Sequence, residues 1–144
     1  MKILIINPNS SSEMTEAIDR TAKKFVAGEY EVITLPTQGA PMFIDSYQDK
    51  AAALPGMMNI VREYENDVDA FIIACHCDPN IEVIREMTDK LVVGIGEASI
   101  KMASMLGHKF SVVSTGKRSI PNKEAMIHGY HLSGALASVR SPKN

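Results

Sequence analysis

Tryptophan is absent from the sequence, and no run of basic residues is longer than two. The chain therefore has neither an obvious platform on which nucleobases could stack nor the basic clusters that bind phosphates. Its formal net charge is −2, which does not favour an anionic membrane surface. From these absences we expect neither nucleic acid nor a membrane among its partners.

Long apolar segments are also missing. The first apolar run, Ile3–Ile6, is too short for the core of a signal peptide, and no run approaches the roughly 20 residues that span a membrane. There are two cysteines, Cys75 and Cys77, and a single residue between them is a poor spacing for a structural disulfide. Reduced thiols fit a reducing compartment, so we predict a cytoplasmic protein.

Several short apolar runs are continuous rather than alternating. This pattern is typical of strands that are buried on both faces of a parallel sheet. A chain of 144 residues is long enough to bury a core around such a sheet. We predict strands at Ile3–Ile6, Val32–Leu35, Val68–Ala74, Leu91–Ile95 and Phe110–Val113, and a weaker sixth strand at Ala135–Val139.

Apolar residues at helical spacing separate these runs. We expect the first helix to begin with a capping box of Ser10 and Glu13 and to end at Gly28. Most methionines fall at helical spacing and are expected in the core. Alternating strands and helices predict an α/β fold with a parallel sheet, helices on both faces, and ligands at the carboxyl ends of the strands. The other helices are predicted around Met57–Tyr64, with Pro55-Gly56 starting or kinking it, around Ile81–Met87, and at Ala98–Leu106 and Pro121–Ile127.

The segment Cys75-His76-Cys77-Asp78-Pro79 follows the most hydrophobic strand. Asp78 and Pro79 are predicted to be the cap and the first residue of the next helix, whose dipole would favour the reactive thiolate form of Cys75. The alternative is a buried, inert cysteine. A metal site built from Cys75, His76, Cys77 and Asp78 is disfavoured, because these ligand types are consecutive and a second cluster is missing.

The segment Gly94-Ile95-Gly96 resembles the start of a dinucleotide-binding fingerprint, with Ser99 at the third glycine position. The acidic residue expected after the next strand is missing. We therefore interpret the two glycines as a tight turn and expect no nucleotide cofactor. Glu97 is interpreted as a carboxylate in the first turn of the following helix.

Small polar side chains end two of the predicted strands. Asn7 and Asn9 carry amides that can pair with an imide or a carboxylate, and Ser114 and Thr115 occupy a similar place. The alternative for each is an ordinary turn or helix cap. The two segments also form a faint internal repeat of strand, polar loop and helix start, although such a match can equally arise by chance.

Four segments together resemble the hydantoin/allantoin racemases of the aspartate/glutamate racemase superfamily. The resemblance extends from Met1 to about Arg140. The segments are Ile-Ile-Asn-Pro-Asn-Ser at 5–10, Ala-Cys-His-Cys-Asp-Pro at 74–79, Val-Val-Gly-Ile-Gly-Glu-Ala-Ser at 92–99 and Phe-Ser-Val-Val at 110–113.

The resemblance implies two pseudo-symmetric α/β halves with a small-molecule substrate between them. It also implies cofactor-independent racemisation at a carbon next to a carbonyl, with one cysteine from each half acting as acid and base. Residues 1–106 would form the first half, and residues 107–144 would begin the second. By position, Cys75 would be the first acid–base group, and the substrate-binding residues would be Asn7, Asn9, His76, Ser114 and Thr115.

Family members continue beyond Asn144, and their second cysteine lies in a later loop. Cys77 and His76 share a loop with Cys75, whereas a two-base racemase needs groups on opposite faces of the carbon. We therefore expect an N-terminal portion that lacks full activity alone. Its incomplete second half would expose apolar surface and favour a homo-oligomer. The alternative function is a non-catalytic domain that keeps the fold and binds a small imide or carboxylate.

Overall fold

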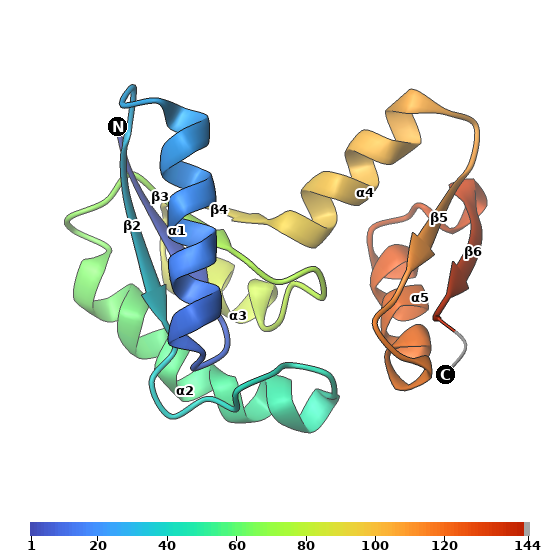
Figure 1. Ribbon diagram of the computed structural model, residues 1–144, viewed down its shortest axis with the longest axis horizontal. Coiled ribbons are helices and arrows are strands. Elements are labelled where there is room, and N and C mark those ends of the chain that lie inside the picture. Colours follow the sequence, from blue (N-terminus) through green and yellow to red (C-terminus); the bar gives the residue numbers. More distant parts are fainter. Residues whose placement is uncertain (143–144) are drawn as a thin grey trace. The chain divides into compact units, whose positions relative to one another are not determined.

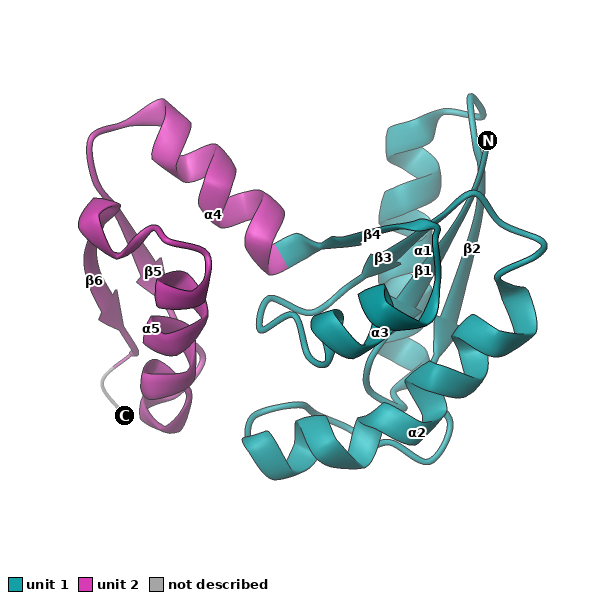
Figure 2. Cartoon of the chain, turned by 180° about the vertical axis from the view of Figure 1, so that it is seen from behind, with its two compact units in different colours: residues 1–95 teal, residues 96–144 magenta. Residues whose placement is uncertain are grey.

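The computed structural model describes residues 1–142 and divides the chain into two compact units (Figures 1 and 2). The first unit is Met1–Ile95, and the second is Gly96–Asn144. Within the described residues, no helix combines the length and apolar character needed to cross a membrane.

The first unit is built on a four-stranded sheet in which every strand pairs in parallel with its neighbours. The strand order is β2-β1-β3-β4, which confirms the predicted parallel α/β architecture. The strands are β1 (Lys2–Asn7), β2 (Glu31–Pro36), β3 (Ala70–Ile73) and β4 (Leu91–Gly94), and the helices are α1 (Ser12–Val26), α2 (Tyr47–Tyr64) and α3 (Ile81–Met87).

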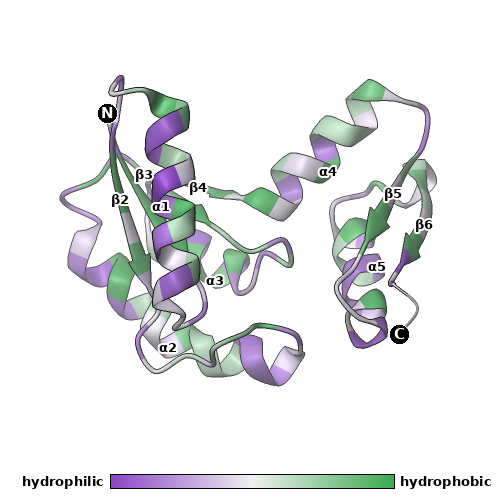
Figure 3. Ribbon diagram, viewed as in Figure 1, coloured by the Kyte–Doolittle hydropathy of each residue, from purple (hydrophilic) through white to green (hydrophobic). Residues whose placement is uncertain are grey.

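The core of the first unit lies between the sheet and the pair α2 and α3. Phe71 and Ile73 of β3 are fully buried there with Met57 of α2 and Ile84 of α3. Each such side chain stabilises the fold by about 1.5–3 kcal/mol relative to an exposed one. Helix α1 covers the opposite face of the sheet, with its polar residues outward (Figures 1 and 3). Helices therefore lie on both faces, as predicted.

Two helix starts in the first unit differ from the prediction. Helix α1 is capped by Ser11, whose hydroxyl accepts from the backbone N–H of Met14, so the predicted capping box of Ser10 with Glu13 is wrong. Helix α2 begins earlier, after the capping residue Ser46, and Pro55 lies inside it. Neighbouring serines offer the same cap chemistry, and packing decides between them.

Two further local predictions are wrong, one at the start of α3 and one at the end of β4. The residue before α3 is Asn80, so Asp78 and Pro79 belong to the preceding turn rather than to the helix start. Helix α4 (Ile95–Leu106) follows β4 directly, so Gly94 ends a strand instead of forming a tight turn. A helix of seven residues that begins six positions after Cys75 removes the basis for the predicted dipole effect.

The second unit contains α4 and a parallel pair of strands joined by a helix. Its core contains Ile100, Val112 and Ile127. The prediction that most methionines are core residues is wrong: Met57 alone of the nine is fully buried among the core side chains, and several are largely exposed. The remaining elements are β5 (Phe110–Val113), the 3-10 turn Lys117–Ser119, α5 (Ile120–Gly129), the 3-10 turn Ser133–Ala135 and β6 (Leu136–Arg140).

Candidate functional site

The carboxyl ends of β1 and β3 lie side by side. Ile6 pairs with Ile73, and the backbone N–H of Ala74 donates to the carbonyl of Ile6 at 2.9 Å. The residues that follow the two strands therefore emerge at one edge of the sheet, where ligands bind in parallel α/β folds. This register places the segment after Asn7 and the segment after Ala74 at the same edge of the sheet.

Asn7 is buried, and its side chain serves the loop that it begins. Its Nδ2 donates to Asn9 Oδ1 at 2.8 Å and to Thr15 Oγ1 at 2.9 Å. Its Oδ1 accepts from the backbone N–H of Asn9 at 3.3 Å. Most of the hydrogen-bonding capacity of Asn7 is therefore used inside the protein, which favours a structural role for this amide.

Asn9 has more capacity left for a ligand. Its Oδ1 accepts from Asn7 and from the backbone N–H of Ser11, which holds the amide plane in place. Its Nδ2 donates to the sulfur of Met14 at 3.4 Å, and a thioether is a weak acceptor. The Asn9 N–H groups are thus the better candidates to meet an anionic or carbonyl oxygen.

Thr37 is a supporting residue that the sequence analysis missed. Its side chain is fully buried, and its Oγ1 donates to the carbonyl of Asn7 at 2.7 Å. Its backbone N–H donates to the carbonyl of Asn9 at 3.0 Å. Gly56 of α2 permits this packing, since a Cβ there would lie 2.5 Å from Thr37 Cγ2. The only sequence signal was a hydroxyl directly after the last residue of β2.

Cys75 begins a tight turn, residues 75–78, here called the cysteine turn. The backbone N–H of Asp78 donates to the carbonyl of Cys75 at 2.9 Å. The turn places the sulfurs of Cys75 and Cys77 3.4 Å apart, and neither forms a disulfide. His76 occupies the position between them and, like both cysteines, is half-buried.

Lys50 of α2 is a second residue that the sequence analysis missed. Its ammonium group donates to the carbonyl of Cys77 at 3.3 Å and lies 5.4 Å from the centre of the Tyr47 ring. Its own carbonyl accepts from Asn80 Nδ2 at 2.7 Å. Lys50 therefore ties α2 to the cysteine turn and brings a positive charge to it, an environment that favours thiolates.

Asp78 closes the cysteine turn and is only 5% exposed. Its φ of 42° lies in the left-handed region, which is uncommon for a residue with a side chain. The carboxylate packs against the end of β4, where a Cβ on Gly94 would lie 2.4 Å from Asp78 Oδ1. Gly94 is therefore required for the close approach of Asp78, and both hold the turn in place.

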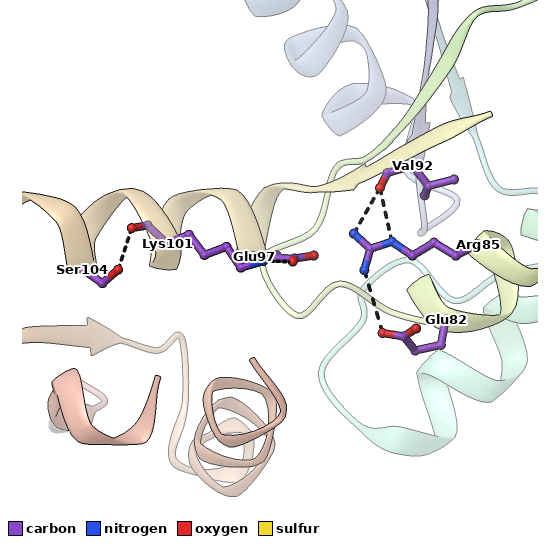
Figure 4. Close-up of polar contacts among 6 residues, drawn as sticks. All are labelled: Glu82, Arg85, Val92, Glu97, Lys101 and Ser104. Carbon is purple, nitrogen blue, oxygen red and sulfur yellow. Dashed lines mark hydrogen bonds and ion pairs between the residues drawn. The ribbon is translucent and has the colours of Figure 1, made fainter. Parts of the chain in front are cut away.

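The close-up in Figure 4 shows how polar side chains bind the elements next to these loops. Arg85 of α3 donates to the carbonyl of Val92 through Nη2 at 3.1 Å and Nε at 3.3 Å, which joins α3 to β4. In the first turn of α4, Glu97 forms an ion pair with Lys101. Glu97 thus lies in the first helical turn, as interpreted from the sequence.

The other two predicted site residues belong to the second unit. Ser114 is buried, and its hydroxyl forms a hydrogen bond with that of Ser119. Ser119 Oγ also donates to the carbonyl of Gly116 at 2.9 Å, so the Ser114 hydroxyl is engaged within its own loop. Thr115 is exposed on the same loop. Of the two, Thr115 has the side chain directed to solvent.

Among residues 1–142, no group of three or more histidine, cysteine, aspartate or glutamate side chains is arranged to hold a metal ion. Among the titratable groups, Asp19 on α1 has a clearly displaced pKa. The hydrogen bond from Lys23 holds the pKa of this carboxyl below its ordinary value, against the opposing effect of burial. Lys23 Nζ and Asp19 Oδ2 lie 2.7 Å apart on the surface of α1, so this ion pair is not part of the strand-end loops.

A parallel sheet with polar loops and a cysteine at its carboxyl edge is the architecture of an α/β protein that binds a small ligand at that edge. The sequence model of the Asp/Glu/Hydantoin racemase family matches residues 3–144, and this chain belongs to that family. The resemblance inferred from the four segments is thereby confirmed.

Two of the similar proteins are hydantoin racemases. A hydantoin racemase from Pseudomonas sp. (strain NS671) is 37% identical over 142 residues, which cover 98% of this chain and 57% of that protein. A hydantoin racemase from Paenarthrobacter aurescens is 35% identical over 144 residues, covering 99% and 61%.

Solved structures give the same picture for the fold. An allantoin racemase from Klebsiella pneumoniae superposes with a TM-score of 0.92 at 31% identity, covering 98% of this chain and 58% of the other. An allantoin racemase from Pseudomonas fluorescens superposes with a TM-score of 0.91 at 30% identity, covering 98% and 60%. The chain thus spans about three fifths of the length of these relatives.

Proposed function

We propose that Cys75 is an acid–base group for proton transfer at a carbon next to a carbonyl in a hydantoin, allantoin or related amino-acid derivative. The observation that carries this proposal is the place of Cys75, just after the carboxyl end of β3, which pairs in parallel with β1, the strand that leads into the Asn9 loop. The names of the similar racemases support the substrate class. The reaction needs no cofactor, because a thiolate and a hydrogen-bond donor suffice for it.

In the proposed step the Cys75 thiolate takes the proton from the carbon. The electron pair of the broken C–H bond moves toward the neighbouring carbonyl, whose oxygen becomes negatively charged. Asn9 Nδ2 is the proposed donor to that oxygen, held in plane by Asn7. The charge of Lys50 at the cysteine turn would favour the thiolate that starts the step.

Inversion needs a second acid on the opposite face of the carbon. Cys77 is an unsuitable second acid, since its sulfur lies 3.4 Å from that of Cys75 on the same turn. We therefore propose that residues 1–144 alone exchange the proton on one face and return it to the same face. Full racemisation would require a second acid on the opposite face, which the cysteine turn does not supply.

The remaining predicted contacts are proposed with different supporting observations. His76 would contact the substrate from within the cysteine turn. Thr115 would do so from an exposed position, and Ser114 would support it from beneath. Residues 1–106 and 107–144 are proposed to be a first half and the start of an equivalent second. In support, β1-α1-β2 and β5-α5-β6 are both parallel β-α-β segments.

Deuterium exchange tests the proposal without requiring racemisation. One enantiomer of a 5-substituted hydantoin is incubated with the protein in D2O, and carbon-bound deuterium is followed by NMR and optical rotation by polarimetry. We expect deuterium incorporation above the buffer rate, with rotation retained, and loss of the excess in Cys75→Ser. General acid–base groups typically contribute about 10²–10⁴-fold, so the difference is measurable.

Two results would contradict the proposal. Exchange at the buffer rate with every hydantoin and with allantoin would remove Cys75 from an acid–base role. Binding that raises the melting temperature equally in the wild type and in Cys75→Ser, without exchange, would indicate the non-catalytic binding domain instead. Cys77→Ser is the matched control and should exchange like the wild type.

We also propose that the chain is a cytoplasmic homo-oligomer. Two reduced thiols on one turn fit a reducing compartment. Large apolar side chains are exposed in each unit, including Phe25 at 89% and Leu106 at 82%, and such side chains favour association. Analytical ultracentrifugation should detect a species larger than the monomer; a monomer at every concentration would contradict the oligomer.

A further inference from the structure

The two thiols of the chain lie together on one turn. Cys75 and Cys77 are the only cysteines, and their sulfurs are 3.4 Å apart. A β-turn hydrogen bond from the N–H of Asp78 to the carbonyl of Cys75, 2.9 Å long, sets this arrangement. Neither His76 nor Cys77 has a positive φ, so the turn has no backbone strain at its centre.

We propose that Cys75 and Cys77 form a reversible disulfide with each other. The oxidant is a low-molecular-weight disulfide, such as oxidised glutathione. The inference rests on the proposed function only for its consequence, which is that oxidation removes the Cys75 thiol from proton transfer. Bond formation itself depends on the geometry of the turn and not on any catalytic role of either thiol.

The bond requires a small displacement of two flexible side chains. The sulfurs must approach from 3.4 Å to about 2.05 Å, which χ1 rotations can supply if the turn yields slightly. Closing a loop across one residue strains the disulfide, and strained disulfides are the more easily reduced ones. The spacing that made a permanent structural disulfide unsuitable therefore suits a labile, regulatory one.

The proposed reaction consists of two exchanges. The thiolate of one cysteine attacks a sulfur of oxidised glutathione, which forms a mixed disulfide and releases one glutathione thiolate. The thiolate of the second cysteine then attacks the protein sulfur of the mixed disulfide and releases the second glutathione. The protein loses two protons and two electrons, and the oxidised glutathione is reduced to two thiols.

Lys50 favours the thiolate that each exchange needs. Its ammonium group donates to the carbonyl of Cys77 at 3.3 Å, so a positive charge lies at the turn. Both cysteines are half-buried rather than enclosed in the core, so a small disulfide can reach them. The buried Asp78 and Gly94 hold the end of the turn, so the strain of closure falls on residues 75–77.

The experiment equilibrates the full chain in a series of reduced and oxidised glutathione ratios, followed by alkylation and intact mass spectrometry. We expect the oxidised wild type to be lighter by two hydrogens and to accept no alkyl groups. Dithiothreitol should restore both the mass and the two alkylatable thiols. Cys77→Ser should instead become heavier by one glutathione, because the second exchange has no thiol. Cys75→Ser is the reciprocal variant and should also show no loss of hydrogens.

Several results would overturn the inference. If the inference holds, the wild type must not keep two alkylatable thiols at every glutathione ratio. It must also neither accumulate glutathione adducts without losing hydrogens nor form only disulfide-linked dimers. Deuterium exchange measured on the same samples separates the two proposals. A disulfide without exchange activity in the reduced protein would remove the proposed function, whereas exchange without a disulfide would remove the switch.

Discussion

Replacing Gly94 with alanine tests how the cysteine turn is held. The new Cβ would lie 2.4 Å from Asp78 Oδ1, 2.5 Å from Asp78 Cγ and 2.8 Å from Ile81 Cδ1. Contacts this short do not persist, so Asp78 must move, and its buried position on a left-handed backbone gives it little room. Overpacking of this kind costs about 1–3 kcal/mol, and we expect Gly94→Ala to lower the free energy of unfolding by that amount.

Urea denaturation followed by circular dichroism measures this free energy. Gly134→Ala is the matched control, because a Cβ there meets nothing within 4 Å and its φ is not positive, so we expect a change within about 0.5 kcal/mol. A double-mutant cycle with Asp78→Ala identifies the cause. Without the carboxylate the alanine should cost less, giving a coupling of about 0.5–3 kcal/mol. A Gly94→Ala cost equal to the control, or a zero coupling, would refute the reasoning.

Three further predictions concern other contacts. Thr37→Val leaves the buried carbonyl of Asn7 without its side-chain donor and should cost about 1–3 kcal/mol in urea denaturation; no loss would contradict its supporting role. Lys50→Met keeps the apolar stem but removes the charge, so the cysteine turn should react more slowly with iodoacetamide; an unchanged rate would contradict the electrostatic argument. The lowered pKa of Asp19 means that its pair with Lys23 stabilises the folded state above the unfolded pKa and is lost as the pH falls through the folded pKa; Asp19→Asn should lose about 0.3–0.5 kcal/mol at neutral pH and nothing at strongly acidic pH, measured by urea denaturation.

The strands were predictable because a two-sided sheet leaves a strong local signal. Leu4 and Ile6 face one layer, Ile3 and Ile5 face the other, and the continuous apolar run follows from burial on both sides. Family membership was predictable for a different reason, since four short sequence segments kept their order along the chain. The position of Cys75 after a strand was predictable because the apolar run of that strand ends at the preceding residue.

The contacts that support the site were not predictable from local sequence. Thr37 acts through a hydrogen bond to a carbonyl 30 residues away, and Lys50 through one 27 residues away. The φ of 42° at Asp78 follows from its packing against Gly94, and Asp78-Pro79 otherwise has the composition of a helix start. Nothing in the order of residues marks such pairs until the fold brings them together.

The two amides of the first strand-end loop differ in how freely they can change during evolution. Asn7 is tied to Asn9 and Thr15, so almost any replacement would disturb the loop itself. Asn9 Nδ2 donates to the weak acceptor Met14, so a replacement that still accepts from Asn7 and Ser11 would alter what the loop binds and not how it folds. Among descendants of this chain that adopt new substrates, position 9 should diverge and position 7 should stay the same.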